Sequence, residues 1–201
     1  MLKSWRHLAL LLGLWTAPLG GGASACEKFT PVDSVTANQL MRLVEDDGAK
    51  AIDRIYAFET LTCSSLPVLR RFALETGLKS KDPLLRSQAL AETLFQRESI
   101  RVEFSDSSDL GPQERDWLKR WGGSYTYDTK YRNRTKNCVS SHYDNRADDC
   151  SGFVARIDGD KVRMSNQNVR YELQLQADNT LRGFVKPSDS LRPIPTKVSL
   201  F

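Results

Sequence analysis

The stretch VRYELQLQ, residues 169–176, decides the fold of the second half of this 201-residue chain. Its apolar and polar residues alternate, so that Val169, Tyr171, Leu173 and Leu175 share one face of an extended strand and only polar residues fill the other. Alternation with a period of two is typical of a half-buried antiparallel strand. The stretch therefore predicts a sheet with one face on a core and one face in water.

Neighbouring stretches with similar alternation predict further strands on both sides of this one. GFVARI (152–157), KVRMS (161–165) and TLRGFVK (180–186) are separated from one another and from the first stretch by turn-forming segments such as IDGDK and ADNT. Such segments favour hairpins. The sequence thus predicts an antiparallel β-meander over residues 121–201, folded as a small sandwich or an open barrel, with PIPTKVSLF (193–201) as an edge strand.

The start of this half, WGGSY at 121–125, resembles the opening of lipocalin-like barrels. That resemblance implies a barrel whose interior carries a small ligand. The strands that are clear in the sequence are fewer than the roughly eight that enclose a ligand in such barrels. The resemblance nevertheless makes a small-ligand carrier one alternative function for the chain.

Ahead of the sheet, over about 33–98, the apolar residues recur at helical spacing and predict a series of short helices. Thr36 is the expected N-cap of the first helix, and Gly77 is the expected end of the third. In the fourth helix, Asp82 is a natural N-cap and Pro83 takes the first helical position. Helices followed by an antiparallel meander make the predicted fold class α+β.

The start of the fourth helix carries the pattern D-P-x-x-R-x-x-A-L, which resembles the second part of a HEAT-like repeat over roughly residues 49–97. The matching residues are Asp82, Pro83, Arg86, Ala89 and Leu90. The resemblance implies antiparallel helix pairs that stack on one another, with the aspartate and the arginine in the turn and in the packing between repeats. A single copy fits an antiparallel helical bundle equally well.

A polar segment separates the two halves and is expected to link them. Pro112 opens a short helix near its end, and Trp117 and Trp121 are expected to seat the second half on the first. The sequence therefore divides into a signal peptide, a helical domain, a linker with a short helix and an antiparallel β domain, over residues 1–25, 26–98, 99–120 and 121–201.

The N-terminal segment has the features of a secretory signal peptide. Lys3 and Arg6 precede a short apolar run that leads to the small residues Ala23, Ser24 and Ala25. The run is shorter than the roughly 20 residues that span a bilayer. We therefore expect an exported protein, periplasmic or secreted, with no membrane span. Removal of the signal peptide would leave 27 of the 29 basic residues against 25 acidic ones. This nearly neutral balance predicts no nucleic acid partner.

The chain has an even number of cysteines, which suits an oxidising compartment. The cysteines are Cys26, Cys63, Cys138 and Cys150. We favour disulfides between Cys138 and Cys150, inside the β domain, and between Cys26 and Cys63, which would pin the N-terminus to the helices. The shorter loop would contribute about 3 kcal/mol in the chain-entropy model.

Cys26 is also a candidate for lipidation. Its surroundings partly match the lipobox of bacterial lipoproteins, Leu-small-small-Cys, with Ala23 in the place of the leucine. The resemblance implies a protein anchored to a membrane surface by a lipid. A lipidated Cys26 could not bond to Cys63, so the lipid tether and the disulfide exclude each other.

The most unusual region is KYRNRTKNCVSSHYDNRADDC, residues 130–150, which we expect to be a long loop closed by the second disulfide. Long loops between strands often carry function. Its basic side chains are expected to clamp anionic groups, and its aromatic side chains to contact a partner. The candidate binding residues are Tyr131, Arg132, Arg134, Lys136, His142 and Tyr143.

The same region holds the residues that could carry metal or acid–base chemistry. Cys138, His142 and Cys150, with Asp148 or Asp149, would form a zinc site. Oxidation of the two thiols competes with such a site, so we expect no metal and no other cofactor. His142 is the only histidine after the signal and the only candidate catalytic residue, because the motifs of serine hydrolases, phosphate loops and metalloproteases are missing.

These observations favour an exported binding or adaptor protein of the cell envelope. It would present the disulfide-closed loop to another envelope or extracellular protein. Two alternatives stay open, namely a hydrolase of cell-wall or glycan substrates with His142 and loop carboxylates in its site, and the small-ligand carrier. Because catalytic motifs are missing, a binding protein is favoured over an enzyme.

Overall fold

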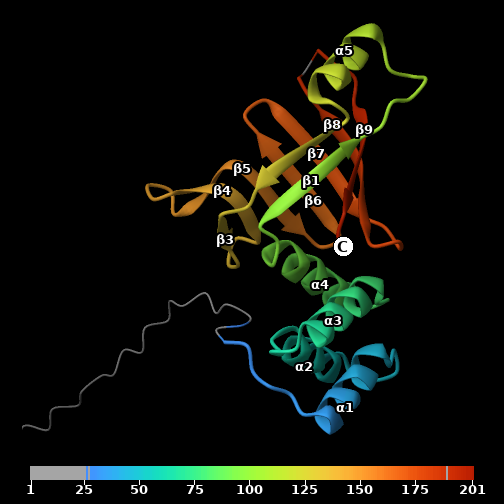
Figure 1. Cartoon of the computed structure of the whole chain (residues 1–201), viewed down its shortest axis with the longest axis vertical. Helices are drawn as coiled ribbons and strands as arrows, with labels where there is room; N and C mark the ends of the chain where they lie inside the picture. Colours follow the sequence, from blue (N-terminus) through green and yellow to red (C-terminus); the bar gives the residue numbers. More distant parts are fainter. Residues whose placement is uncertain (1–25, 27, 189) are drawn as a thin grey trace, which may run out of the picture.

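The computed structural model describes residues 26, 28–188 and 190–201, so the expected signal peptide lies outside the described residues. Within the described part, the chain forms five α-helices and a nine-stranded antiparallel sheet. Four helices stack at one end of the molecule, the curled sheet follows, and the fifth helix lies at the far end (Figure 1). The predicted α+β class is confirmed.

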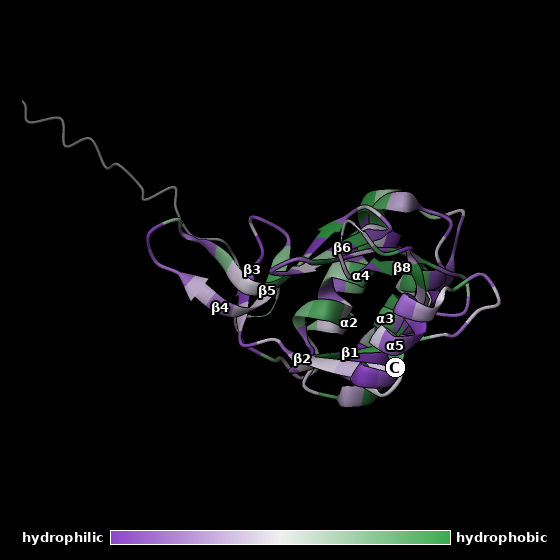
Figure 2. Cartoon of the chain, turned by 90° about the horizontal axis from the view of Figure 1, so that it is seen from above, coloured by the Kyte–Doolittle hydropathy of each residue, from purple (hydrophilic) through white to green (hydrophobic). Residues whose placement is uncertain are grey.

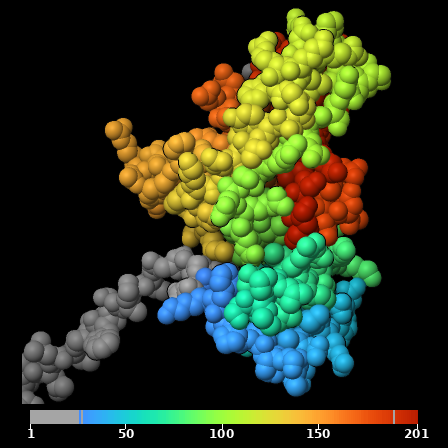
Figure 3. Space-filling model, viewed as in Figure 1, coloured from blue at the N-terminus to red at the C-terminus, as the bar shows by residue number. Residues whose placement is uncertain are grey.

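The helical part is built from consecutive helices that pack on their neighbours, α1 on α2, α2 on α3 and α3 on α4. The helices are α1 (Ser34–Glu45), α2 (Ala51–Thr62), α3 (Pro67–Lys79) and α4 (Pro83–Phe95). Phe58, Leu78 and Leu90 are fully buried between them. Figure 3 shows these helices, blue to teal, as one block beneath the β part.

Two helix starts show how local hydrogen bonds set the boundaries. At α4, Asp82 accepts hydrogen bonds from the backbone N–H groups of Leu84 and Leu85, as the sequence predicts. At α1 the expected cap is wrong, because Asp33 rather than Thr36 caps the helix. The Asp33 carboxylate lies three residues earlier and accepts hydrogen bonds from the Thr36 hydroxyl and from the N–H groups of Thr36 and Val35, which lowers its pKa.

Gly77 does not end the third helix, as expected, but lies inside it and is buried. A Cβ atom at this position would lie 2.7 Å from the Cβ of Ala89 on α4 and 3.0 Å from the ring of Phe58 on α2. The absence of a side chain therefore allows α3 to approach both neighbouring helices closely. The helix continues to Lys79, and Ser80 follows it.

The sheet has the strand order β2-β1-β9-β8-β7-β6-β5-β4-β3. Its strands are β1 (Ser99–Phe104), β2 (Ser124–Asp128), β3 (Tyr131–Asn133), β4 (Cys138–Asp144), β5 (Asp149–Asp158), β6 (Lys161–Asn166), β7 (Val169–Leu175), β8 (Thr180–Lys186) and β9 (Ile194–Ser199). The meander from β3 to β9 is continuous, and β9 then pairs with β1, which precedes the whole meander in the chain.

Two predictions for the β part differ from the structure, the extent of the linker and the position of the last strand. The expected linker over 99–120 begins with β1, whose apolar residues Ile100, Val102 and Phe104 alternate with polar ones and point into the core. The tail strand β9 is not an edge strand, because it pairs with β1 on one side and β8 on the other. The sheet therefore recruits a strand from outside the predicted β domain.

The sheet curls so far that β2, at one end of the strand order, lies over β5 and β7. Tyr127 on β2 stacks on Phe153 of β5, with ring centroids 4.0 Å apart, and its hydroxyl lies 2.6 Å from that of Tyr171 on β7. Burial raises the pKa of both phenols. Large side chains fill the inside of the curve, among them Met164 and Ile194, both almost wholly buried.

The fifth helix, α5 (Pro112–Trp121), begins at Pro112 as predicted but does not seat the β half on the helices. Trp117 packs edge-on against Phe104 of β1, and Trp121 packs against Tyr125 of β2. The helix lies at the end of the molecule opposite α1 to α4 (Figure 1). The expected role of the two tryptophans is therefore wrong, since they close the far end of the sheet.

The close approach of α3 to α4 generates the first prediction. Gly77→Ala is expected to lower the free energy of unfolding by about 1–3 kcal/mol, because the new methyl group would overlap Ala89 and Phe58. Gly48→Ala, in the exposed turn after α1, is the matched control, since its Cβ would meet only the side chain of Asp46, at 3.2 Å. Urea denaturation of both variants measures the difference, and equal losses would contradict the packing argument.

Candidate functional site: the disulfide-closed double hairpin

Residues 130–150 are not one long loop, as expected, but two consecutive hairpins, and we call them the double hairpin. The strands β3, β4 and β5 are joined by turns at 134–137 and 145–148. Asn137 and Asp148 take positive φ angles of 46° in these turns, a conformation that asparagine and aspartate tolerate better than most residues. The polar composition thus reflects tight turns and exposed strand faces rather than an irregular loop.

Both expected disulfides are present. Cys138 is bonded to Cys150, and Cys26 is bonded to Cys63. Cys138 and Cys150 are buried and pack with Val154 in a small apolar cluster that is separate from the main core. The first disulfide thus ties the N-terminal segment to the end of α2, and the second ties β4 to β5.

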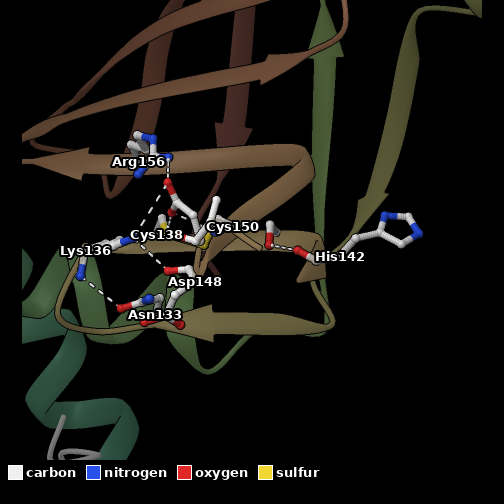
Figure 4. Close-up of a disulfide and its surroundings, with 10 residues drawn as sticks. Asn133, Lys136, Cys138, His142, Asp148, Cys150 and Arg156 are labelled. Atoms are coloured by element: carbon white, nitrogen blue, oxygen red, sulfur yellow. Dashed lines mark hydrogen bonds and ion pairs between the residues drawn. A yellow bond between two sulfur atoms is a disulfide. The ribbon is translucent and has the colours of Figure 1, made fainter. Parts of the chain in front are cut away.

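A polar layer covers the second disulfide. The ammonium group of Lys136 donates to the backbone carbonyl of Asp148 at 2.7 Å, which joins the two turns of the double hairpin. The carboxylate of Asp149 accepts a hydrogen bond from Arg156 at 2.9 Å, and this bond lowers the pKa of Asp149. Figure 4 shows these groups gathered around Cys138 and Cys150. Lys136 therefore cross-links the two turns.

The two arginines of the region face the helical part. Arg134 forms an ion pair with Glu92 of α4, a side chain with only 6% of its surface exposed, and its guanidinium lies 4.6 Å from the ring centre of Phe95. Burial lowers the pKa of Arg134. Arg132 donates to the backbone carbonyls of Phe95 and Arg97, where α4 ends. Both arginines therefore hold the double hairpin on α4.

The aromatic residues form the exposed tip. The rings of Tyr131 and Tyr143 lie 4.5 Å apart, and the hydroxyl of Tyr143 donates to Asp148 at 2.7 Å. This hydrogen bond raises the pKa of Tyr143 to about 12. The imidazole of His142 points away from the disulfide (Figure 4), and its Nδ1 atom lies 2.9 Å from the hydroxyl of Ser141. Tyr143 is 43% exposed.

The residues considered for metal or acid–base chemistry are not brought together. The ligand atoms of Cys138, Cys150 and Asp149 lie within 4.8 Å of one another, but the two sulfur atoms are bonded to each other. The ring of His142 points the other way. Asp148 accepts from Tyr143, and so its carboxylate is engaged on the far side from the imidazole. Among the described residues, the histidine, the two cysteines and the aspartates of this region therefore do not converge on one point.

Sequence reasoning missed the partners of the two arginines, above all Glu92. One signal was present, because Glu92 follows Leu85 and Ala89 at the spacing of the buried face of α4, where a carboxylate is expensive unless it is paired. The pairing itself spans 42 residues of sequence and crosses from a helix to a hairpin. No local pattern contains such a contact.

No protein-family model, curated protein or solved structure matches this chain. The HEAT-like resemblance also differs from the structure in one contact, because Arg86 donates to the carbonyl of Leu175 on β7 rather than to a neighbouring repeat. In the described part of the chain, no helix has the length and apolar character that crossing a membrane requires. The functional argument therefore rests on the geometry of the chain itself.

The buried ion pair on α4 generates the second prediction. Arg134→Gln is expected to lower the free energy of unfolding by about 3 kcal/mol, because the carboxylate of Glu92 would stay buried without its cation. Arg71→Gln is the matched control, since Arg71 pairs with Glu75 on the exposed surface of α3 and should cost less than about 1 kcal/mol. Urea denaturation compares the two, and a loss as small as that of the control would refute the role assigned to Arg134.

Proposed function

We propose that the protein is an exported binding protein that presents the tip of the double hairpin to another protein of the cell envelope or the extracellular space. The tip consists of His142, Tyr143 and the turn 145–148. One observation carries the proposal: the double hairpin projects from the body of the molecule in both views (Figures 1 and 2), yet its base is held by covalent and ionic contacts.

The rigidity of the base supports a role in recognition. The disulfide, the Lys136 cross-link and the two arginine contacts on α4 all lie behind the tip and restrict its position. Association costs free energy when side chains and loops must be ordered, and a surface that is ordered in advance avoids part of that cost. The helical part then serves as the support that orients the tip.

The chemistry of the tip suits a protein partner. Tyrosine is enriched among the residues that dominate binding energy, because it buries a large rigid ring and can still form a hydrogen bond. Tyr143 is held by its contacts with Tyr131 and Asp148 while much of its surface stays exposed. His142, the preceding residue of β4, adds a second exposed ring on the opposite face of the hairpin. These two residues carry the binding that the sequence analysis assigned to the whole region.

Two features support export. Both disulfides would be reduced in an ordinary cytosol, whereas they persist in secreted and periplasmic proteins. The N-terminal segment has the order of charges and apolar residues of a signal peptide. In the structure the sulfur of Cys26 is bonded to Cys63, which favours a soluble protein over one with a lipid on the same sulfur.

The covalent state generates the third prediction. Peptide mass spectrometry of the protein from its native source, without reducing agent, is expected to show a mature chain that begins at Cys26, with Cys26 linked to Cys63 and Cys138 linked to Cys150. Reduction should separate each linked pair and serves as the control. An acyl mass on Cys26 would contradict the soluble form and establish a lipid tether instead.

The tip generates the fourth prediction. A photo-reactive amino acid in place of His142 is expected to give one discrete covalent adduct with a protein in native envelope fractions. The same amino acid in place of Gln113, an exposed residue of α5 far from the tip, should not give that adduct. Adding Tyr143→Ser should reduce the adduct at least about tenfold, since the aromatic anchor would be lost.

The matched control for this loss is Tyr56→Ser, which removes an exposed tyrosine of α2. It should leave the adduct unchanged. Equal labelling from the two crosslinking positions, or an adduct that survives Tyr143→Ser, would exclude the tip as the binding surface.

A further inference from the structure

A second surface of the molecule, the outer face of strands β5 to β9, is predominantly basic. Side chains that point away from the core on these strands alternate with buried ones. The basic residues on this face are Arg156, Lys161, Arg163, Arg170, Arg182, Lys186 and Lys197. The acidic residues among the same strands are Asp149, Asp158 and Glu172. Since the expected mature chain is close to neutral, positive charge is concentrated here.

The register of the sheet places like charges directly opposite each other on this face. The cross-strand pairs are Arg156 with Arg163, Arg170 with Lys186, and Arg182 with Lys197. Like charges in directly opposed positions destabilise a sheet. Charged residues often protect edge strands from aggregation, but β6, β7 and β8 are each paired on both sides. Opposite charges also face each other here, Arg163 across from Glu172 and Lys161 across from Asp158, so the face combines an excess of cations with a few carboxylates.

A groove of about 500 Å³ lies within this basic face. Its floor includes the backbone of Leu173 and Gly183, where a Cβ atom on Gly183 would lie 1.9 Å from the carbonyl oxygen of Glu172. Only glycine permits β7 and β8 to approach so closely at this point. The polar and aromatic residues that line it are Asp158, Lys161, Arg163, Glu172, Gln174, Arg182 and Phe184.

The lining combines groups of three kinds. Arg163 and Arg182 can bind carboxylates through two parallel N–H donors, and Lys161 adds a third cation. Phe184 is 39% exposed and offers the face of its ring, which attracts the weakly positive C–H groups of a sugar. Glu172 and Gln174 can accept hydrogen bonds from hydroxyl groups. We propose that this groove binds a chain of an acidic polysaccharide, with its carboxylates on the arginines and a sugar ring on Phe184.

The cations are available to such a ligand. Arg163 pairs with Asp158 at 3.0 Å and Arg182 with Asp178 at 2.5 Å, but all four side chains are about half exposed or more. Exposed ion pairs of this kind contribute little free energy, on the order of 0–1 kcal/mol. A carboxylate that approaches either guanidinium can therefore share or replace the aspartate at small cost.

Two other polyanions fit the groove less well. A lipid bilayer presents a broad surface, which would meet the rim of the recess and leave Phe184 and the floor uncontacted. Nucleic acid carries closely spaced phosphates and few hydroxyl donors, so it would leave Asp158 and Glu172 inside the groove without hydrogen-bond donors from the ligand. An acidic polysaccharide has both the anions for the arginines and the hydroxyl groups for the carboxylates.

The test measures binding of the purified protein to polygalacturonate, a linear polymer of sugar acids, by isothermal titration calorimetry. Arg163→Gln with Arg182→Gln is expected to weaken binding at least about tenfold, which corresponds to about 1.4 kcal/mol. Arg71→Gln with Arg120→Gln removes the same charge from α3 and α5 and should change binding less than about twofold.

Phe184→Thr keeps the charge and the β-strand propensity and is expected to weaken binding severalfold. Thermal unfolding of each variant establishes that it is folded before binding is measured. Tyr143→Ser, at the tip of the double hairpin, should leave polygalacturonate binding unchanged. A failure of the polysaccharide proposal can therefore be distinguished from a failure of the proposed protein-binding function.

Several results would overturn the inference. Absence of binding to polygalacturonate would do so, as would an equal loss in the α3 and α5 control variant. Binding to neutral dextran with the same affinity would exclude a role for the cations. Tighter and arginine-dependent binding to vesicles of phosphatidylglycerol and phosphatidylcholine in equal parts, or to a single-stranded oligothymidylate, would replace the polysaccharide with a membrane or a nucleic acid.

Discussion

The ion pair between Glu92 and Arg134 is the contact on which the arrangement of the two halves depends. A carboxylate on the buried face of α4 is costly without a cation, so the helix is fully stable only when the double hairpin folds against it. Arg132 adds hydrogen bonds to the carbonyls at the end of α4, where the helix dipole favours positive charge. The helices therefore fix the base of the double hairpin, and its tip is left to project.

The periodicity of the sequence was sufficient to predict the architecture but not its boundaries. The alternation in β7 and the capping signals of α4 rest on neighbours within a few residues, and both predictions are confirmed. β1 was missed because it lies between polar segments, although Ile100 and Val102 alternate as in the other strands. β9 was expected at an edge because its second neighbour is β1, which lies more than ninety residues earlier in the chain.

The candidate site was predicted as a region but not in its detail. Both disulfides could be inferred, because four cysteines allow few pairings and one pair closes a short polar segment. The direction in which each side chain points could not be inferred, because it depends on partners that are distant in the sequence. Arg132 and Arg134 look like exposed anion clamps when read locally, yet their partners are on α4. His142 and Tyr143 are exposed at the tip, whereas Arg132 and Lys136, although also exposed, are engaged by backbone carbonyls of the chain itself.

Arg156 connects the two surfaces proposed for binding. It pairs with Asp149 above the disulfide of the double hairpin, and it stands directly opposite Arg163 on the basic face. Asp149 therefore partly neutralises the cation that would otherwise repel Arg163 most strongly. An anion bound to Arg163 would relieve the same repulsion and leave the Asp149 contact less necessary. Because solvent and salt reach both the Arg156–Asp149 pair and the Arg163–Asp158 pair, this coupling is small, and the two proposed surfaces would act nearly independently.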